Sequence, residues 1–183
     1  VQTCALPIFS PLVWDNPAED LNRFDAFVFR SCWNYHRKFR QFLNWLEVLR
    51  AQQKPILNSL EVSIANLDKV YLLDLQKKGA PLPVTEWIKR GSSIDSIEVK
   101  TKLNTFTGKQ IVIRPTISLG GQDTYLVSTN DETELKKIWK SMPIDSDILV
   151  QEYIPEIRTA GETSLIFFNG RFSHARSEEH TSE

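Results

Sequence analysis

Residues 111–127, IVIRPTISLGGQDTYLV, place a cation and two glycines between apolar segments. Gly120 and Gly121 permit a positive φ, and consecutive backbone N–H groups in such a turn can form an anion-binding concavity. Arg114 precedes the turn, where its charge would offset that of a phosphate. The pattern predicts a phosphate-holding loop between two strands, with a plain hairpin and a surface arginine as the alternative. It is not a P-loop, which needs G-x-x-x-x-G-K-[ST] at the start of a helix.

A second candidate cation is Lys69, in the segment NLDKVYLLDLQKKGAPLPVT. Asn66 is expected to cap a helix over residues 67–78, and Gly79 to end it. Lys69 would then lie in the first helical turn, where a positive charge opposes the helix dipole and gains nothing locally. Phosphates bind at helix N-termini, so Lys69 is a candidate phosphate ligand. The alternative is an ordinary solvated lysine.

A third candidate is the segment DILVQEYIPEIRTAGETSLIFF, in which an apolar strand ends in Gln-Glu-Tyr-Ile before an irregular loop. Backbone N–H and C=O groups in such a connection can bind the edge of a flat heterocycle. Glu162, which opens the next strand, could accept hydrogen bonds from sugar hydroxyls. Solvated carboxylates at an ordinary strand end are the alternative.

The elements that position these residues follow from hydrophobic periodicity and turn residues. Residues 24–31 and 54–59 are predicted strands that flank a helix over residues 37–53, which is the βαβ unit of a parallel sheet. Beyond residues 58–65 the pattern changes to mixed α+β. Asn169-Gly170 predicts a hairpin turn between residues 162–168 and 171–175. The other predicted strands cover residues 84–88, 110–114, 124–127 and 147–153, and the other predicted helices cover 95–104 and 131–141.

The composition is that of a globular protein: 183 residues, 41% hydrophobic and 25% charged, with a net charge of −1. This charge gives no argument for nucleic acid or for a membrane surface, and no apolar run approaches the roughly 20 residues that span a bilayer. We therefore expect a cytoplasmic protein. Two cysteines are too few for a disulfide framework or a zinc site.

Both ends match what widely used sequencing-adapter DNA would encode: VQTCALPI at residues 1–8 and RSEEHTSE at residues 176–183. We expect both segments to be foreign to the gene, and the native part, residues 9–175, to be open at both ends. Ordinary polar termini are the alternative. The acidic residues of the last segment should then not be taken for metal ligands.

The order of these motifs, together with DAFVFRSCWNYH, NLDKVYLLDL and LVQEYIPEIRTAGETSLIFFNGRFSHA, resembles the ATP-grasp superfamily. The chain is most similar to its glutathione-synthetase-like branch, which includes the cyclo-ligase of cycloserine biosynthesis. The resemblance implies an α/β and α+β fold, with a partial Rossmann-like pre-ATP-grasp domain over residues 9–60. An incomplete ATP-grasp module would follow over residues 61–175.

The resemblance also implies a role for each candidate residue. Lys69 and Arg114 would contact ATP phosphates, and Arg114, which stands where the family usually has lysine, would also be catalytic. Arginine keeps the charge but has a different shape. The phosphate loop would contain Ser118, Gly120 and Gly121, the adenine pocket Gln151, Glu152 and Ile154, and the ribose contact Glu162.

Four residues at the end of the first predicted strand are candidates for substrate binding: Arg30, Ser31, Trp33 and Tyr35. They lie at the carboxyl end of a parallel strand, where ligands bind in such sheets. Packing at a domain boundary is the alternative. The family's Mg²⁺ ligands would lie beyond Ala175.

The sequence therefore predicts an ATP-dependent carboxylate–amine ligase that acts on small molecules through an acyl phosphate, in a chain that would be inactive by itself. A non-catalytic ATP-binding module and a plain α/β interaction domain are the alternatives. Substrate identity and oligomeric state do not follow from these residues.

Overall fold

The computed structural model describes residues 8–29 and 32–178, and it divides into two compact units. The first unit ends at Gly79 and regains Thr116–Gln122, while the second comprises Ala80–Pro115 and the chain from Asp123 onward. The loop predicted to hold phosphate therefore belongs to the first unit, although the strands on either side of it belong to the second.

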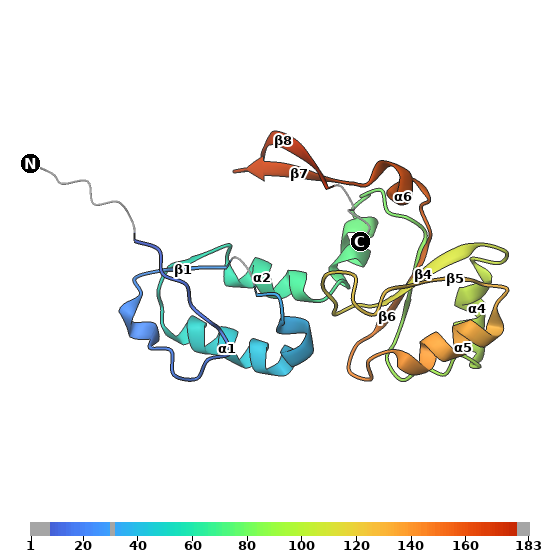
Figure 1. Ribbon diagram of the computed structural model, residues 1–183, viewed down its shortest axis with the longest axis horizontal. Helices are drawn as coiled ribbons and strands as arrows, with labels where there is room; N and C mark the ends of the chain where they lie inside the picture. The colour runs from blue at the N-terminus through green and yellow to red at the C-terminus, as the bar shows by residue number, and fades with distance from the viewer. Residues whose placement is uncertain (1–7, 30–31, 179–183) are drawn as a thin grey trace, which may run out of the picture. The chain divides into compact units, whose positions relative to one another are not determined.

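The first unit contains the expected strand–helix–strand arrangement (Figure 1). Strands β1 and β2 pair in parallel, with Phe27 opposite Ile56 and Val28 opposite Leu57. Both strands are shorter than predicted. The elements are η1 (Leu21–Arg23), β1 (Phe27–Val28), η2 (Tyr35–Lys38), α1 (Phe39–Ala51), β2 (Ile56–Leu57), α2 (Leu60–Leu67) and α3 (Tyr71–Lys77).

The core of the first unit forms on one face of α1. Phe42, Leu46 and Leu49 are buried at the three- and four-residue spacing of an amphipathic helix. Trp14 packs edge-on against Phe42, with ring centroids 4.9 Å apart. Leu60, from α2, completes the same cluster. Cys32 and Tyr35, from the segment that carries the predicted substrate-binding residues, pack against this cluster.

The prediction of one helix over residues 67–78 is wrong, because two helices meet there with a break between them. Ser59 caps α2 by accepting a hydrogen bond from the Val62 N–H at 3.3 Å, and α2 already ends at Leu67. Asp68 is extended, and its carboxylate accepts from the Val70 N–H at 3.1 Å, a local bond that competes with helix continuation. Lys69 therefore lies in the break, and the helix-dipole argument does not apply to it.

The second unit is built on an antiparallel sheet in the order β3-β6-β4-β5. Helices α4 and α5 pack against one face of this sheet through a cluster that includes Val99, Ile113, Ile138 and Val150. The strands confirm the predicted positions to within one or two residues. The elements are β3 (Thr85–Ile88), α4 (Ile97–Asn104), β4 (Gln110–Pro115), β5 (Tyr125–Ser128), α5 (Glu132–Ser141) and β6 (Ile148–Glu152).

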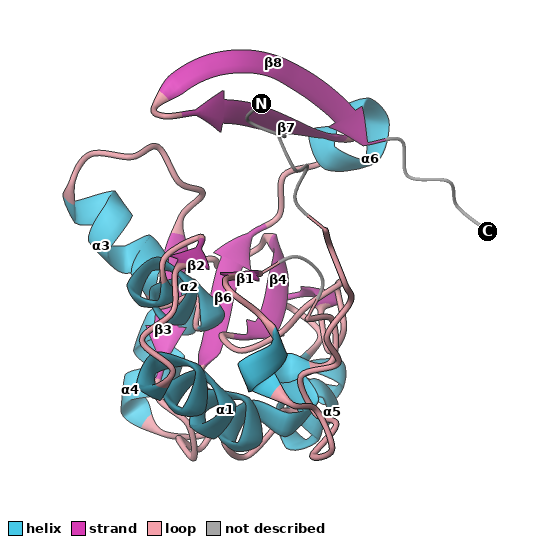
Figure 2. Cartoon of the chain, turned by 90° about the vertical axis from the view of Figure 1, so that its left-hand side faces the viewer, coloured by secondary structure: helices cyan, strands magenta, loops and turns pink. Residues whose placement is uncertain are grey.

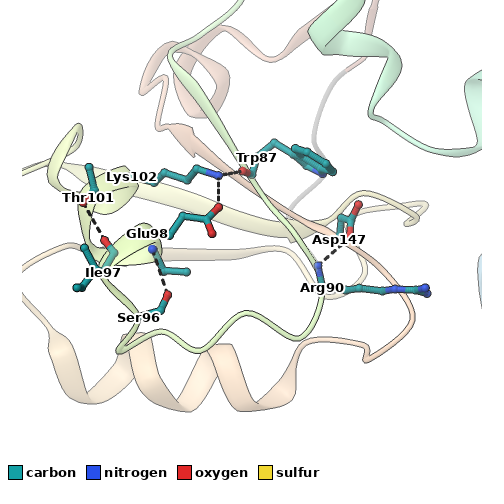
Figure 3. Close-up of polar contacts among 9 residues, drawn as sticks. Trp87, Arg90, Ser96, Ile97, Glu98, Thr101, Lys102 and Asp147 are labelled. Atoms are coloured by element: carbon teal, nitrogen blue, oxygen red, sulfur yellow. Dashed lines mark hydrogen bonds and ion pairs between the residues drawn. The ribbon is translucent and has the colours of Figure 1, made fainter.

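Polar contacts fix the entry and the body of α4 (Figure 3). Ser96 caps the helix by accepting from the Val99 N–H at 3.2 Å. Lys102 donates at 2.8 Å to the Trp87 carbonyl and at 2.9 Å to the Glu98 carboxylate, which ties the helix to β3. The sheet face that carries the core is thus closed by α4, and side chains of the opposite register face away from that core.

A separate two-stranded sheet follows the short helix α6 (Glu156–Ala160), which lies where the sequence predicted an irregular loop. Strands β7 (Glu162–Phe168) and β8 (Arg171–Glu178) form the predicted hairpin, drawn as a ribbon in Figure 2. Asn169 and Gly170 have φ values of 49° and 74°, as a tight turn of this kind requires. Pairing continues to Glu178, three residues into the segment that is expected to be foreign to the gene.

Candidate functional site

The first group of candidate residues, called the lysine–loop cluster, consists of Lys69, Thr116, Ser118, Gly120 and Gly121. The Lys69 ammonium donates to the Ser118 carbonyl at 2.5 Å, to the Ser118 Oγ at 3.0 Å and to the Thr116 carbonyl at 3.4 Å. The Lys69 backbone N–H also donates to Thr116 O, at 3.0 Å. The structure thus brings together Lys69 and Ser118, which the sequence had placed in one site, and it adds Thr116.

The loop turns at its two glycines. The Gln122 N–H donates to the Leu119 carbonyl at 3.2 Å, and Gly120 and Gly121 between them have φ values of 63° and 72°. Two consecutive positive φ values are typical of a type I′ turn and are costly for residues with a side chain. A Cβ built on either glycine would meet nothing within 4 Å. Glycine is therefore needed for backbone conformation, and the space beside the turn is open.

The second group, called the strand-end cluster, lies in the second unit and consists of Thr85, Arg114 and Gln151. Arg114 donates to the Gln151 Oε1 at 2.6 Å, and the Gln151 Nε2 donates to the Thr85 Oγ1 at 2.9 Å. Gln151 is only 8% exposed. The register of the sheet sets Gln151 opposite both Thr85 and Val112, so all three clustered side chains share one face. Sequence reasoning missed Thr85, since the pairing of β3 with β6 cannot be read from either strand.

The remaining adenine and ribose candidates are distributed over three positions. Glu152 alternates to the opposite face from Gln151 and forms an ion pair with Lys109 at 2.7 Å. Its backbone N–H donates to Val84 O and is therefore already used in the sheet. Ile154 is half-buried just after β6, and Glu162 is exposed at the start of β7. Their roles toward a nucleotide stay predictions.

Two of the four substrate candidates line a pocket in the first unit. Trp33 and Tyr35 stand in its wall, while Arg30 and Ser31 lie outside the described residues. Burial raises the pKa of Tyr35 and that of the Cys32 thiol, so both groups stay neutral near pH 7. The pocket has a volume of about 240 Å³ and is lined by Phe29, Cys32, Trp33, Tyr35, Phe42, Ser63, Leu67 and Leu119.

Comparison with known proteins adds an independent observation to this geometry. Residues 8–58 match the family model of the D-cycloserine synthetase DcsG N-terminal domain. The cycloserine biosynthesis protein DcsG of Streptomyces lavendulae is 28% identical to the chain over 163 residues. The crystal structure of D-cycloserine synthetase DcsG superposes with a TM-score of 0.72 at 25% identity, covering 88% of this chain and 55% of that one. The chain is homologous to DcsG.

The match covers 88% of this chain and 54% of the Streptomyces DcsG, so the chain spans about half the length of the curated relative it matches. The predicted resemblance to a cycloserine-biosynthesis ligase is thereby confirmed, as is a mixed α/β fold that corresponds to part of such a protein. A structure of the ATP-grasp ligase PsnB with a minimal precursor gives a TM-score of 0.42 at 17% identity, over 71% of this chain and 44% of PsnB, too distant to add to the assignment.

Within residues 8–29 and 32–178, no three His, Cys, Asp or Glu side chains come together in a way that could hold a metal ion. In the same residues, no helix has both the length and the apolar character to cross a membrane.

Proposed function

We propose that the protein is an ATP-dependent ligase that joins a small-molecule carboxylate to an amine through an acyl phosphate. Homology to DcsG supports a ligase, and the observation that carries the nucleotide part is the lysine–loop cluster. This cluster combines the Lys69 ammonium group and the Ser118 hydroxyl group with the backbone of the glycine turn, all within Lys69 and residues 116–122. These are the donors that phosphate oxygens accept from.

The donor set fits a triphosphate. Open space lies beside Gly120 and Gly121. The Lys69 ammonium donates hydrogen bonds to the carbonyl and hydroxyl oxygens of Ser118, and phosphate oxygens could accept these hydrogen bonds instead. Bound ATP would supply the phosphoryl group that activates the carboxylate, with Mg²⁺ offsetting its charge. No Mg²⁺ ligand is assigned to the described residues.

Each group of residues has one task in this proposal. Lys69 and the loop hold the phosphates, and Arg114, oriented by Gln151, offsets the charge that develops as the phosphoryl group moves. The end of β6 holds the adenine with Gln151, Glu152 and Ile154, and Glu162 holds the ribose. The pocket at Trp33 and Tyr35, with Arg30 and Ser31 next to it in sequence, orients the substrate so that the amine can displace phosphate.

Calorimetric titration with the ATP analogue AMPPNP and Mg²⁺ tests the nucleotide site. Lys69→Met and Arg114→Met should each weaken binding about tenfold or more, because each removes a charge-assisted hydrogen bond to phosphate. Lys77→Met is the matched control, since Lys77 is an exposed lysine of the same unit that pairs only with Asp74, at 3.5 Å, among the described residues. Wild-type protein that binds no AMPPNP, or a Lys69 variant that binds as tightly as wild type, would overturn the proposal.

Hydroxylamine trapping tests the chemistry on the full-length product of the gene. With ATP and a mixture of amino-acid carboxylates, an acyl phosphate would be captured as a hydroxamate. Nucleotide binding without any hydroxamate would favour the non-catalytic ATP-binding module instead.

A further inference from the structure

The side chain of Gln122, which closes the glycine turn, is held by two residues of the 3₁₀ helix η2, His36 and Arg37. Its Oε1 lies 3.2 Å from Arg37 Nε, 3.1 Å from Arg37 Nη2 and 2.8 Å from His36 Nε2. His36 and Arg37 are 86 and 85 residues away in sequence, yet all three belong to the first unit. The Gln122 amide oxygen thus contacts three nitrogen atoms, and Gln122 is the last loop residue that belongs to the first unit.

The chemistry of these contacts fixes both the amide and the imidazole. Arg37 can only donate, so the Gln122 atom facing it must be the oxygen and not the NH₂ group. The same oxygen can only accept, so His36 carries its proton on Nε2 and donates. The His36 Nδ1 is buried without a partner among the described residues. A buried polar atom left unpaired costs stability.

The loop is held on both sides of its turn. Before the turn, Ser118 accepts from Lys69, and after it Gln122 accepts from His36 and Arg37. Between these anchors Leu119 lines the pocket that also contains Trp33 and Tyr35. The backbone N–H groups of Gly120 and Gly121 therefore sit on a segment whose two ends are pinned to one unit. Holding these N–H groups in place before the nucleotide binds lowers the entropic cost of phosphate binding.

We propose that His36 and Arg37 are positioning residues for the phosphate loop, acting through Gln122 to fix the glycine turn for nucleotide binding. This inference rests on the proposed function. Neither residue is proposed to touch the phosphates. The two-donor fork of Arg37 matters more than its charge, because a lysine in its place could not donate twice to one oxygen from a planar group.

Titrations with AMPPNP and with AMP test the proposal. Arg37→Ala, Arg37→Lys and Gln122→Ala should each weaken AMPPNP binding about five- to tenfold, while AMP, which lacks the β and γ phosphates, should bind as to wild type. A merely structural role would weaken both ligands alike. Arg40→Ala is the matched control, since Arg40 is exposed, lies three residues away, and its side chain makes no hydrogen bond or ion pair with the described residues.

Hydrogen exchange of the backbone amides in residues 119–123 is a second test, and it measures the anchoring of the loop without a nucleotide. Gln122→Ala should speed exchange there and leave the amides of α5 unchanged. If Arg37→Lys and Gln122→Ala bind AMPPNP like wild type while Arg37→Ala does not, Arg37 acts as a simple cation and the proposal is wrong. If wild type binds no AMPPNP, the proposed function fails; unchanged exchange in Gln122→Ala would overturn the loop anchor itself.

Discussion

Gln151 shows how one buried amide organises the residues around it. Its oxygen accepts from Arg114 and its nitrogen donates to Thr85, so both ends of the amide are used and its orientation is set by its neighbours. The Thr85 hydroxyl in turn donates a hydrogen bond to the Pro83 carbonyl at 2.8 Å. Such a connected chain holds the Arg114 guanidinium in one place within the sheet.

Replacing this amide tests the connection at the residue scale. Gln151→Leu should lower the free energy of unfolding by about 1–3 kcal/mol, because it removes partners from two polar groups in a largely buried setting. Denaturant titration measures the change. Gln110→Leu, at an exposed position of β4, is the control and should lie within about 0.5 kcal/mol of wild type. Equal stability of the two variants would contradict the assigned role.

Among the elements, the ones that matter most for the site are short and irregular. The break between α2 and α3 puts the Lys69 backbone and side chain on the same loop carbonyl, which a continuous helix would not allow. A chain of side-chain hydrogen bonds holds the 3₁₀ helix η2. Trp14 donates to Asn34 at 2.6 Å, and Asn34 and Lys38 both donate to Asp15, at 2.9 and 2.7 Å.

The polar chain at η2 predicts a pH effect. The hydrogen bond from Lys38, followed by that from Asn34, lowers the pKa of Asp15 below its usual value of 3.8. A carboxylate with a lowered pKa stabilises the fold above the unfolded value, and this contribution is lost as pH falls through the folded value. Asp15→Asn should therefore be less stable than wild type at pH 7, and the difference should shrink below about pH 4.

Denaturant titrations between pH 7 and pH 2.5 measure that difference. Asp25→Asn, which removes a carboxylate at an exposed position of the same unit, corrects for the loss of one negative charge. A stability difference between wild type and Asp15→Asn that stays constant down to pH 2.5 would show that the carboxylate contributes nothing through its charge.

At the scale of the whole molecule, the described residues form two hydrophobic cores and one two-stranded sheet without a core of its own. The clusters around Leu46 and around Ile113 each contain residues with no exposed surface. The hairpin β7–β8 instead leaves large apolar side chains in solvent. Leu165, Phe167, Phe168 and Phe172 are 58%, 54%, 65% and 58% exposed. A strand pair of this kind is a site for self-association.

We therefore expect the chain to self-associate as its concentration rises. In sedimentation-velocity experiments the double variant Phe168→Lys, Phe172→Lys should stay monomeric to at least about tenfold higher concentration than wild type, because charge on an exposed strand opposes pairing. Thr163→Lys with Ser173→Lys adds the same charge to polar positions of the hairpin and is the control. A wild-type chain that stays monomeric, or a control that works equally well, would count against the apolar surface as the cause.

The sequence by itself determined most of the local elements and the resemblance to cycloserine-biosynthesis ligases. Periodicity located α1, α5 and the strands of the antiparallel sheet, and Asn169-Gly170 located the hairpin turn, because these depend on neighbouring residues. The order of Lys69, Arg114 and the glycines indicated a ligase, and homology to DcsG agrees with that reading.

Only the tertiary structure decided which side chains meet. The contacts of Lys69 with Ser118, of Gln151 with Thr85 and of Gln122 with Arg37 join residues 49, 66 and 85 positions apart. No local pattern encodes such distances, since strand register and the return of residues 116–122 to the first unit arise from packing of the whole chain. The α2–α3 break was missed for a related reason. A side-chain bond from Asp68 and a loop carbonyl from Thr116 outweighed helix propensity there.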